Sequence, residues 1–169
     1  MASTLTRGIR YIRNDFDHLP GTPMDLARFF PYRLARLAES VSQATAQVYA
    51  QRFGLTRDEW RIVAALAGQG AMKTTRIMEN STLDKMRVSR AMARLERDGL
   101  VGRTPDPEDG RAWLVKLLPA GNSLYRKIVP MVLAREAFLL EALSEEEKVV
   151  LERAMSKVHE RAEQLLRQG

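Results

Sequence analysis

The sequence contains no cysteine and only two histidines, His18 and His159, among its 169 residues. The chain therefore has neither a thiolate metal site nor a cysteine with which to sense peroxides. The two histidines stand far apart without a partner at metal-ligand spacing, so we expect neither to bind a metal. No Ser-His-Asp set, paired carboxylates or glycine-rich phosphate loop stands out. The sequence thus predicts no enzyme and no cofactor.

Long apolar runs are also missing from the chain. No stretch of about 18 apolar residues could span a membrane, and no hydrophobic segment near the N-terminus could serve as a secretion signal. We therefore expect a cytoplasmic protein with no membrane partner. Hydrophobic residues make up 45% of the sequence, which is enough for one domain with a real core.

The net charge of +6 is unevenly distributed. Basic residues outnumber acidic ones by 7 to 4 in residues 1–56 and by 12 to 9 in residues 57–116, whereas residues 117–169 hold 8 of each. This distribution favours a basic face for an anionic partner and a separate, neutral region for assembly.

The segment from Asp84 to Leu100 reads as one helix with two unlike stripes. At about 100° per residue, four basic side chains fall within roughly 80° of one another: Arg87, Arg90, Arg94 and Arg97. Apolar side chains gather about 140° away: Val88, Ala91, Met92 and Leu95. Two interpretations stay open on this evidence. The arginines either pair with acids such as Glu96 and Asp98 or one elsewhere, or they meet the phosphates of a DNA groove.

The residues after this helix favour DNA. Gly99 suits the left-handed residue that closes a helix. Residues 100–104 and 111–117 are rich in β formers and flank a turn at residues 105–110, which predicts a hairpin. A helix followed by a hairpin with arginine near both ends of its tip is typical of a winged helix-turn-helix. In that fold the helix enters the major groove and the wing reaches a minor groove.

The residues before the arginine-rich helix complete this motif. A capping-box pattern at residues 56–59 opens a helix that glycines at positions 68 and 70 close. A short helix is predicted from about Thr74 to Asn80, followed by a turn at residues 81–83 and a cap at Asp84. Two helices joined by so short a turn form a helix-turn-helix.

Three long amphipathic helices flank this centre. The first is predicted to begin near Pro31 and end at Gly54, and the second runs from Pro119 to Leu143 with a kink at Pro130. A second capping box, at residues 144–147, opens the last helix. One subunit cannot bury all their apolar faces, so we predict a homodimer with two recognition helices about one DNA turn apart. The expected segments are an N-terminal arm or short helix (1–24), a dimerisation helix (25–54), a DNA-binding region (55–118) and C-terminal dimerisation helices (119–169).

The joint spacing of several short motifs resembles the MarR family of bacterial transcription regulators. The matching motifs are Leu55-Thr56 followed by Trp60, Val88-Ser89-Arg90, Leu95-Glu96 followed by Gly99-Leu100-Val101 and Arg103, Asp106 followed by Asp109-Gly110-Arg111, and Leu117-Leu118-Pro119-Ala120-Gly121. The resemblance implies a mainly α fold with a small β-hairpin wing, a winged helix-turn-helix within a helical two-fold dimer. Pro119 departs from the family, which usually has threonine there, and leaves the start of the following helix open.

The resemblance also implies double-stranded DNA as the partner, with the protein on the nucleoid when bound. The implied contact residues are Thr74, Asp84, Lys85, Met86, Arg87, Ser89, Arg90, Arg94, Arg97, Arg103, Asp109 and Arg111. We expect Lys85, Arg87 and Arg90 to read guanine edges, Ser89 to meet any base and Met86 a thymine methyl group. Arg94 and Arg97 would contact phosphates. Arg103 and Arg111 would enter the minor groove, and Asp109 would brace the wing turn.

Many members of that family release DNA when a small aromatic or hydrophobic effector binds. The resemblance places a pocket between the long helices and the helix of Trp60, lined here by Tyr32, Arg33, Arg36, Leu37, Trp60 and Met131. Aromatic walls with arginines suit an aromatic acid or its coenzyme A thioester, and the protein would then be a repressor. Two alternatives stay open: these side chains only fill the core and dimer seam, or the winged helix is an architectural or protein-interaction module without an operator.

Overall fold

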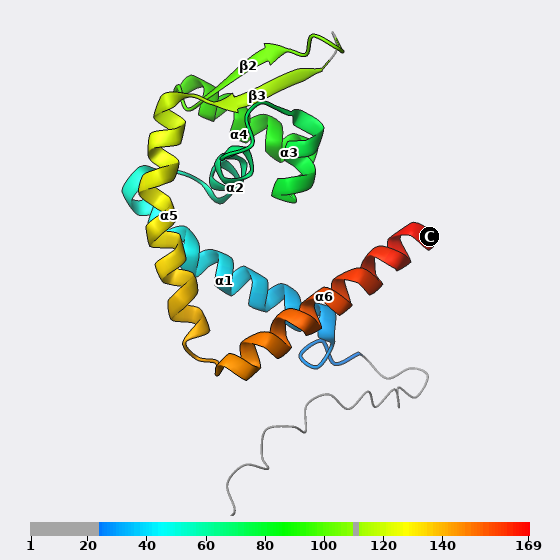
Figure 1. Ribbon diagram of the computed structural model, residues 1–169. Helices are drawn as coiled ribbons and strands as arrows, with labels where there is room; N and C mark the ends of the chain where they lie inside the picture. Colours follow the sequence, from blue (N-terminus) through cyan, green and yellow to red (C-terminus); the bar gives the residue numbers. More distant parts are fainter. Residues whose placement is uncertain (1–23, 110–111) are drawn as a thin grey trace, which may run out of the picture. The chain divides into compact units, whose positions relative to one another are not determined.

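The computed structural model describes residues 24–109 and 112–169. It contains six helices and a small sheet within this part of the chain (Figure 1). The elements are, in order, α1 (Phe30–Phe53), α2 (Arg57–Leu66), β1 (Met72–Lys73), α3 (Thr74–Ser81), α4 (Lys85–Arg97), β2 (Val101–Pro105), β3 (Trp113–Leu117), α5 (Pro119–Leu140) and α6 (Glu145–Gln168). This confirms the predicted mainly α fold with a small β wing.

The chain divides into two units, residues 1–40 and residues 41–169, and α1 crosses the boundary between them. In the first unit, a turn precedes α1, where the carboxylate of Asp25 accepts a hydrogen bond from the amide of Ala27 at 3.0 Å. No described residue of this unit is buried. The predicted N-terminal arm lies outside the described residues except for Met24.

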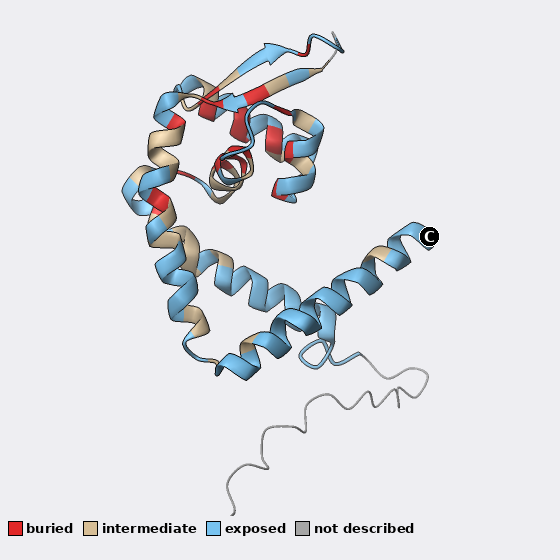
Figure 2. Cartoon of the chain, viewed as in Figure 1, coloured by how far each residue is buried: buried red, intermediate tan, exposed pale blue. Residues whose placement is uncertain are grey.

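The core of the second unit forms around α2, which contacts α3, α4, α5 and β3 (Figure 2). The helix presents Ile62, Val63 and Leu66 inward, with exposed fractions of 2% or less. The apolar stripe predicted for α4 is buried in full: Val88, Ala91, Met92 and Leu95. The arginine-rich helix is therefore fixed by its apolar side, and its opposite side is left for other contacts.

The helix-turn-helix consists of α3, a turn and α4. Thr82 adopts a left-handed conformation (φ 55°), and the carboxylate of Asp84 accepts a hydrogen bond from the amide of Arg87 at 2.9 Å. Gly99, also left-handed, ends α4 with a Schellman motif, because Leu100 N donates to the carbonyl of Leu95 at 2.9 Å. The predicted caps at both ends of α4 are confirmed.

The sheet has three antiparallel strands in the order β1-β3-β2. The hairpin of β2 and β3 was predicted, and it pairs Val101 with Leu117 and Pro105 with Trp113. The strand β1 was missed, because only two residues form it and neither alternation nor turn signals mark so short a strand. It pairs Met72 with Val115 and so joins the start of α3 to the wing.

The helix α5 begins with Pro119 in its first turn, which resolves the doubt about its start. A Cβ atom on Gly121 would lie 2.1 Å from the carbonyl oxygen of Leu100, so only glycine allows α5 to pass this close to the wing base. The helix ends at Leu140 rather than at the predicted Leu143. Pro130 lies inside it without ending it.

The last helix, α6, opens with the predicted capping box between Ser144 and Glu147. The hydroxyl of Ser144 accepts the amide of Glu147 at 3.2 Å, and the carboxylate of Glu147 accepts the amide of Ser144 at 2.9 Å. No residue of α6 is buried, including its apolar stripe (Figure 2).

A buried carboxylate, that of Glu59, connects three helices of the second unit. One oxygen accepts a hydrogen bond from the amide of Thr56 at 2.7 Å and completes the predicted capping box of α2. The other lies 3.3 Å from Nε of Arg94 on α4. Arg94 also donates to the carbonyl of Gly54, immediately after α1, at 3.1 Å. Glu59 is only 2% exposed, so its carboxylate is shielded from water, whereas the side chain of Arg94 remains 44% exposed.

A second acidic residue, Asp106, braces the wing loop between β2 and β3. Its side chain is buried, one oxygen accepts the amide of Glu108 at 3.0 Å, and the other lies 2.8 Å from Nζ of Lys73 on β1. The hydrogen bond from Lys73 is the main reason why the pKa of Asp106 lies below its ordinary value of 3.8, and it raises the pKa of Lys73. Asp106 thus ties the wing to β1.

Replacing Glu59 with alanine is expected to lower the free energy of unfolding by about 2–3 kcal/mol, because the amide of Thr56 and the guanidinium of Arg94 lose their buried acceptor. Glu147→Ala is the matched control, since Glu147 holds the same capping position in the exposed first turn of α6. It should cost about 0.5 kcal/mol. Urea denaturation followed by circular dichroism measures both values. Equal losses in the two variants would contradict a central role for Glu59.

Acidification is expected to loosen the wing loop before the rest of the fold. The pKa of Asp106 is lower in the folded state, so its stabilising contribution is present above the unfolded value and is lost as the pH falls through the folded value. Hydrogen exchange of the Glu108 amide should therefore accelerate, relative to core amides of α2, below about pH 4. Asp106→Asn should show fast exchange at neutral pH already. Unchanged protection in that variant would rule out the brace.

Candidate nucleic-acid interface

The first two turns of α4 present a polar, basic surface to solvent. Lys85, Met86, Ser89 and Arg90 are exposed there, and Met86 has an exposed fraction of 68%. Within the described residues, neither Lys85 nor Arg90 has an ion pair or a side-chain hydrogen bond. Their positive charges are therefore available to an anionic partner. The surface is held rigidly, because the opposite side of α4 belongs to the core.

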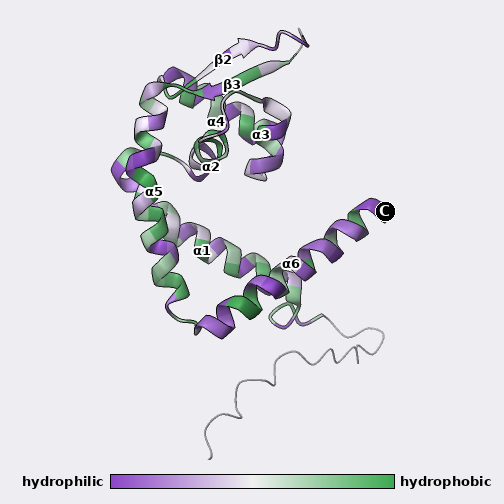
Figure 3. Cartoon of the chain, in the orientation of Figure 1, coloured by the Kyte–Doolittle hydropathy of each residue, from purple (hydrophilic) through white to green (hydrophobic). Residues whose placement is uncertain are grey.

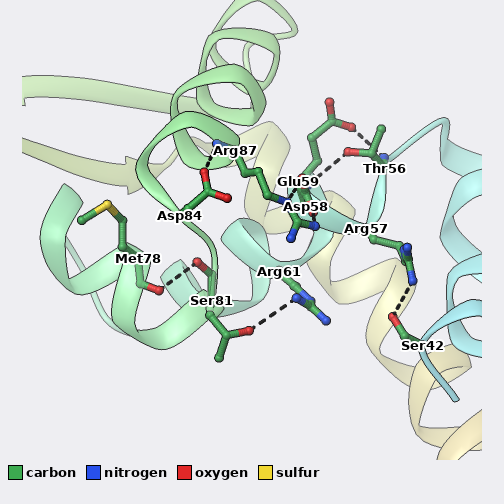
Figure 4. Close-up of polar contacts among 11 residues, drawn as sticks. Ser42, Thr56, Arg57, Asp58, Glu59, Arg61, Met78, Ser81, Asp84 and Arg87 are labelled. Carbon is green, nitrogen blue, oxygen red and sulfur yellow. Dashed lines mark hydrogen bonds and ion pairs between the residues drawn. The ribbon is translucent and has the colours of Figure 1, made fainter. Parts of the chain in front are cut away.

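Arg87 is bound differently from Arg90. Its guanidinium donates from Nε to Oδ2 of Asp58 at 3.0 Å and from Nη2 to Oδ1 at 2.5 Å (Figure 4). This two-point hydrogen bond with Asp58 is the main reason why the pKa of Arg87 is raised. Both side chains remain partly exposed, at 39% for Arg87 and 24% for Asp58.

Of the two interpretations that the sequence left open for the arginines of α4, pairing with an acid of another helix therefore holds for two of the four. Arg87 and Arg94, seven residues apart, share one side of the helix and pair with the adjacent acids Asp58 and Glu59 in the first turn of α2. Arg97 lies further along, and among the described residues its ion pair is with its neighbour Asp98, at 3.4 Å, with 71% of its side chain exposed. The helix thus carries an internally paired arginine side and an open cationic side.

One of the two wing arginines, Arg103, also differs from expectation. Arg103 was predicted to enter the minor groove, but it lies at the wing base, opposite Val115, and donates two hydrogen bonds to Glu96 on α4. Because Glu96 on α4 binds its guanidinium, the side chain of Arg103 does not extend beyond the strand toward a groove. Gly110 and Arg111 lie outside the described residues.

Two further predicted contact residues occupy defined places near the wing. Asp109 is exposed, and its carbonyl accepts the amide of Ala112 at 2.8 Å across the loop. A further acid of the same loop, Asp106, is buried and braces it, and the bracing role of Asp109 stays a prediction. Thr74 is the first residue of α3, half-buried, and follows Lys73 directly.

The predicted effector residues fall in both units. Trp60 is stacked between Tyr49, at 5.4 Å between ring centroids, and Tyr125, at 5.9 Å. Nη1 of Arg52 donates to the sulfur of Met131 at 3.4 Å. Tyr32, Arg33, Arg36 and Leu37 belong to the unit of residues 1–40, so the pocket that would unite all six stays a prediction.

The aromatic stack contains two residues that the sequence prediction did not assign to this region. Tyr49 is 3% exposed and Tyr125 is half-buried, so Trp60 packs as part of the core. Burial is the main reason why the pKa of Tyr49 is raised, and the charges of Arg57 and Arg61 oppose this effect. No local sequence signal brings Tyr49, Trp60 and Tyr125 together, because the three come from different helices.

Metal-binding clusters and membrane-spanning helices are absent from the part of the chain that the structure describes. No group of three or more acidic, histidine or cysteine side chains could hold a metal ion there. Among the described helices, none combines the length and apolarity needed to cross a membrane.

Comparisons with known proteins agree with this geometry. The MarR family model matches residues 55–113, from two residues before α2 to the start of β3. The HTH-type transcriptional regulator YkoM of Bacillus subtilis is 30% identical over 125 residues, which cover 74% of this chain and 78% of YkoM.

Solved structures share the same fold. A MarR/EmrR family transcriptional regulator from Acinetobacter is 28% identical, with a TM-score of 0.75, and the match covers 83% of this chain and 99% of that one. The structure of NadR in complex with 4-hydroxyphenylacetate is 25% identical, with a TM-score of 0.63, over 75% of this chain and 89% of NadR. Together with the helix-turn-helix of α3 and α4 and the wing of β2 and β3, these matches show that the chain belongs to the MarR family of transcriptional regulators.

Proposed function

We propose that this transcriptional regulator is a sequence-specific repressor that a small aromatic ligand releases from its operator. The observation that carries the proposal is the open cationic surface at the start of α4, where Lys85 and Arg90 have no acidic partner in the described chain. An α-helix fits the major groove, and cations on its first turns lie where base edges and phosphates are reached.

The contacts can be divided by their place on α4. Arg90 and Lys85 are suited to guanine edges, Ser89 to any base and the exposed Met86 to a thymine methyl group. Arg97, near the end of α4, is suited to a phosphate. Nε of Arg94 pairs with the carboxylate of Glu59, so Arg94 has first a structural role. A phosphate contact of Arg94 would use the remaining N–H donors of its guanidinium.

The wing supplies the second proposed contact. Arg111 is the candidate for the minor groove, while Arg103 is held by Glu96 and supports the wing base. Thr74, at the first turn of α3, is placed where a helix N-terminus can bind a phosphate.

A second copy of the chain is the proposed protein partner. Seven large apolar side chains of α6 have exposed fractions between 40% and 76%: Val149, Val150, Leu151, Met155, Val158, Leu165 and Leu166. Apolar and polar segments alternate along this helix (Figure 3), as expected of a helix that packs against a partner on one side. Five of these side chains share one side of the helix, namely Leu151, Met155, Val158, Leu165 and Leu166. A two-fold dimer would cover that side and present two α4 helices to a pseudo-palindromic operator.

The proposed effector is an aromatic acid or its coenzyme A thioester. NadR, which shares the fold, binds 4-hydroxyphenylacetate. The residues proposed to line its pocket are those predicted from the sequence: Tyr32, Arg33, Arg36, Leu37, Trp60 and Met131. Arginines would neutralise the carboxylate and the rings would cover the aromatic group. The ligand would release DNA only by binding the DNA-incompetent dimer more tightly than the competent one.

Replacing Arg90 with alanine is expected to weaken operator binding by about 1–3 kcal/mol and leave the thermal unfolding transition unchanged, because Arg90 has no internal partner. The operator is first obtained by selecting genomic fragments that the purified protein binds. Gel-shift titration then compares Arg90→Ala with Arg153→Ala, an exposed arginine of α6. Equal operator affinity in wild type and Arg90→Ala would disprove the assignment.

Aromatic carboxylates are expected to raise the melting temperature of the protein and to dissociate its operator complex. Thermal-shift screening of benzoates, hydroxycinnamates, phenylacetates and their coenzyme A thioesters measures the first effect, and fluorescence anisotropy of labelled operator measures the second. Aliphatic acids of equal charge are the control. Absence of a shift with every aromatic compound would remove the support for an aromatic effector.

A further inference from the structure

Asp58 differs from Glu59, the other acid in the first turn of α2, because it does not cap the helix. Thr56 and Glu59 complete the capping box between them. The carboxylate of Asp58 instead accepts both hydrogen bonds from Arg87, at 3.0 and 2.5 Å. The pair joins α2 to the third residue of the helix that is proposed to read DNA.

The ion pair leaves one edge of Arg87 open. A guanidinium has five N–H donors in a rigid plane, and Asp58 takes one from Nε and one from Nη2. Both donors of Nη1 and the second donor of Nη2 have no partner in the described chain. The edge formed by Nη1 and Nη2 therefore presents two parallel N–H groups, while Asp58 holds the opposite part of the guanidinium plane in position. Two parallel N–H groups have the geometry that the O6 and N7 acceptors of guanine require.

We propose that Asp58 is a specificity-determining positioning residue that directs Arg87 to a guanine edge and away from phosphates. The inference rests on the proposed DNA-reading role of α4. With Asp58 in place, the side chain of Arg87 is already ordered, so a guanine contact does not have to order it again. Without Asp58, the arginine would search a wide range of rotamers.

Electrostatics favours a contact of Arg87 with guanine over a contact with a phosphate. The Arg87–Asp58 pair carries no net charge, so it gains little from a phosphate and releases no counterion. A phosphate beside Arg87 would also meet the carboxylate of Asp58, whereas guanine presents neutral acceptors that tolerate it. Lys85 and Arg90 lack such a neighbour, so besides reaching guanine edges they can also meet phosphates and add affinity for any sequence. Arg87 would differ from them as a cation that reads guanine and contributes little to sequence-independent binding.

The variant Asp58→Asn keeps the shape of the side chain and removes its charge. We expect its affinity for random duplex to rise by about three- to tenfold at ~0.1 M salt, with a log–log salt slope steeper by about 0.9, because Arg87 gains a phosphate. Selection of bound sequences from a randomised pool should show that the preference for guanine is lost at one position of each half-site. Arg87→Ala should lose guanine at the same position without any gain on random duplex.

The matched control is Glu145→Gln, which removes one negative charge from an exposed ion pair with Lys148 on α6. It should leave the salt slope and the base preference unchanged. Circular dichroism establishes folding, and Asp58→Ser, which also suits the first turn of a helix, replaces asparagine if that variant unfolds.

The outcomes separate the two proposals. Wild-type protein that binds selected and random duplexes equally would overturn the proposed repressor function. A discriminating wild type whose Asp58→Asn variant keeps the same guanine preference and the same affinity for random duplex would overturn the role of Asp58 alone. A variant with lower affinity for both duplexes and an intact fold would overturn it as well, because it would make Asp58 only a support of α4.

Discussion

The buried carboxylate of Glu59 is the polar constraint that, together with the apolar side of α4, fixes the placement of this helix, which is proposed to read DNA. It caps α2, pairs with Arg94 on α4 and, through Arg94, reaches the carbonyl of Gly54 directly after α1. A buried charge is stable only when its partners are in place, so small displacements of any of the three helices are unfavourable. The residue after α1 and the middle of α4 are therefore joined by hydrogen bonds and an ion pair through Arg94, and this connection does not require an apolar contact between the two helices.

This link gives α4 two unlike cationic sides. Arg87 and Arg94 pair with α2, whereas Lys85 and Arg90 have no internal acidic partner. The wing follows the same rule, since Glu96 holds Arg103 and Asp106 holds Lys73. Each pair fixes the position of an element, and on the first two turns of α4 Lys85 and Arg90 remain without an acidic partner in the described chain. The net charge of +6 alone says little about where positive charge is offered to a partner.

The sequence predicted the features that local signals encode. The capping boxes at Thr56 and Ser144, the cap at Asp84, the left-handed Gly99 and the apolar side of α4 depend on residues close in the chain, and all are confirmed. The pairing of Arg87 with Asp58 joins residues 29 positions apart, and that of Arg94 with Glu59 depends on how α2 packs on α4. Periodicity gives the direction of a side chain relative to its own helix only, and it cannot show which neighbour covers that direction.

Methylation interference on a genomic fragment selected by the protein tests most directly whether paired α4 helices read DNA from the major groove. Methylation of guanine N7 blocks contacts in that groove alone. Two patches of interfering guanines, related by symmetry and about 10 base pairs apart, are the predicted result. A single patch, or binding that no N7 methylation impairs, would contradict it.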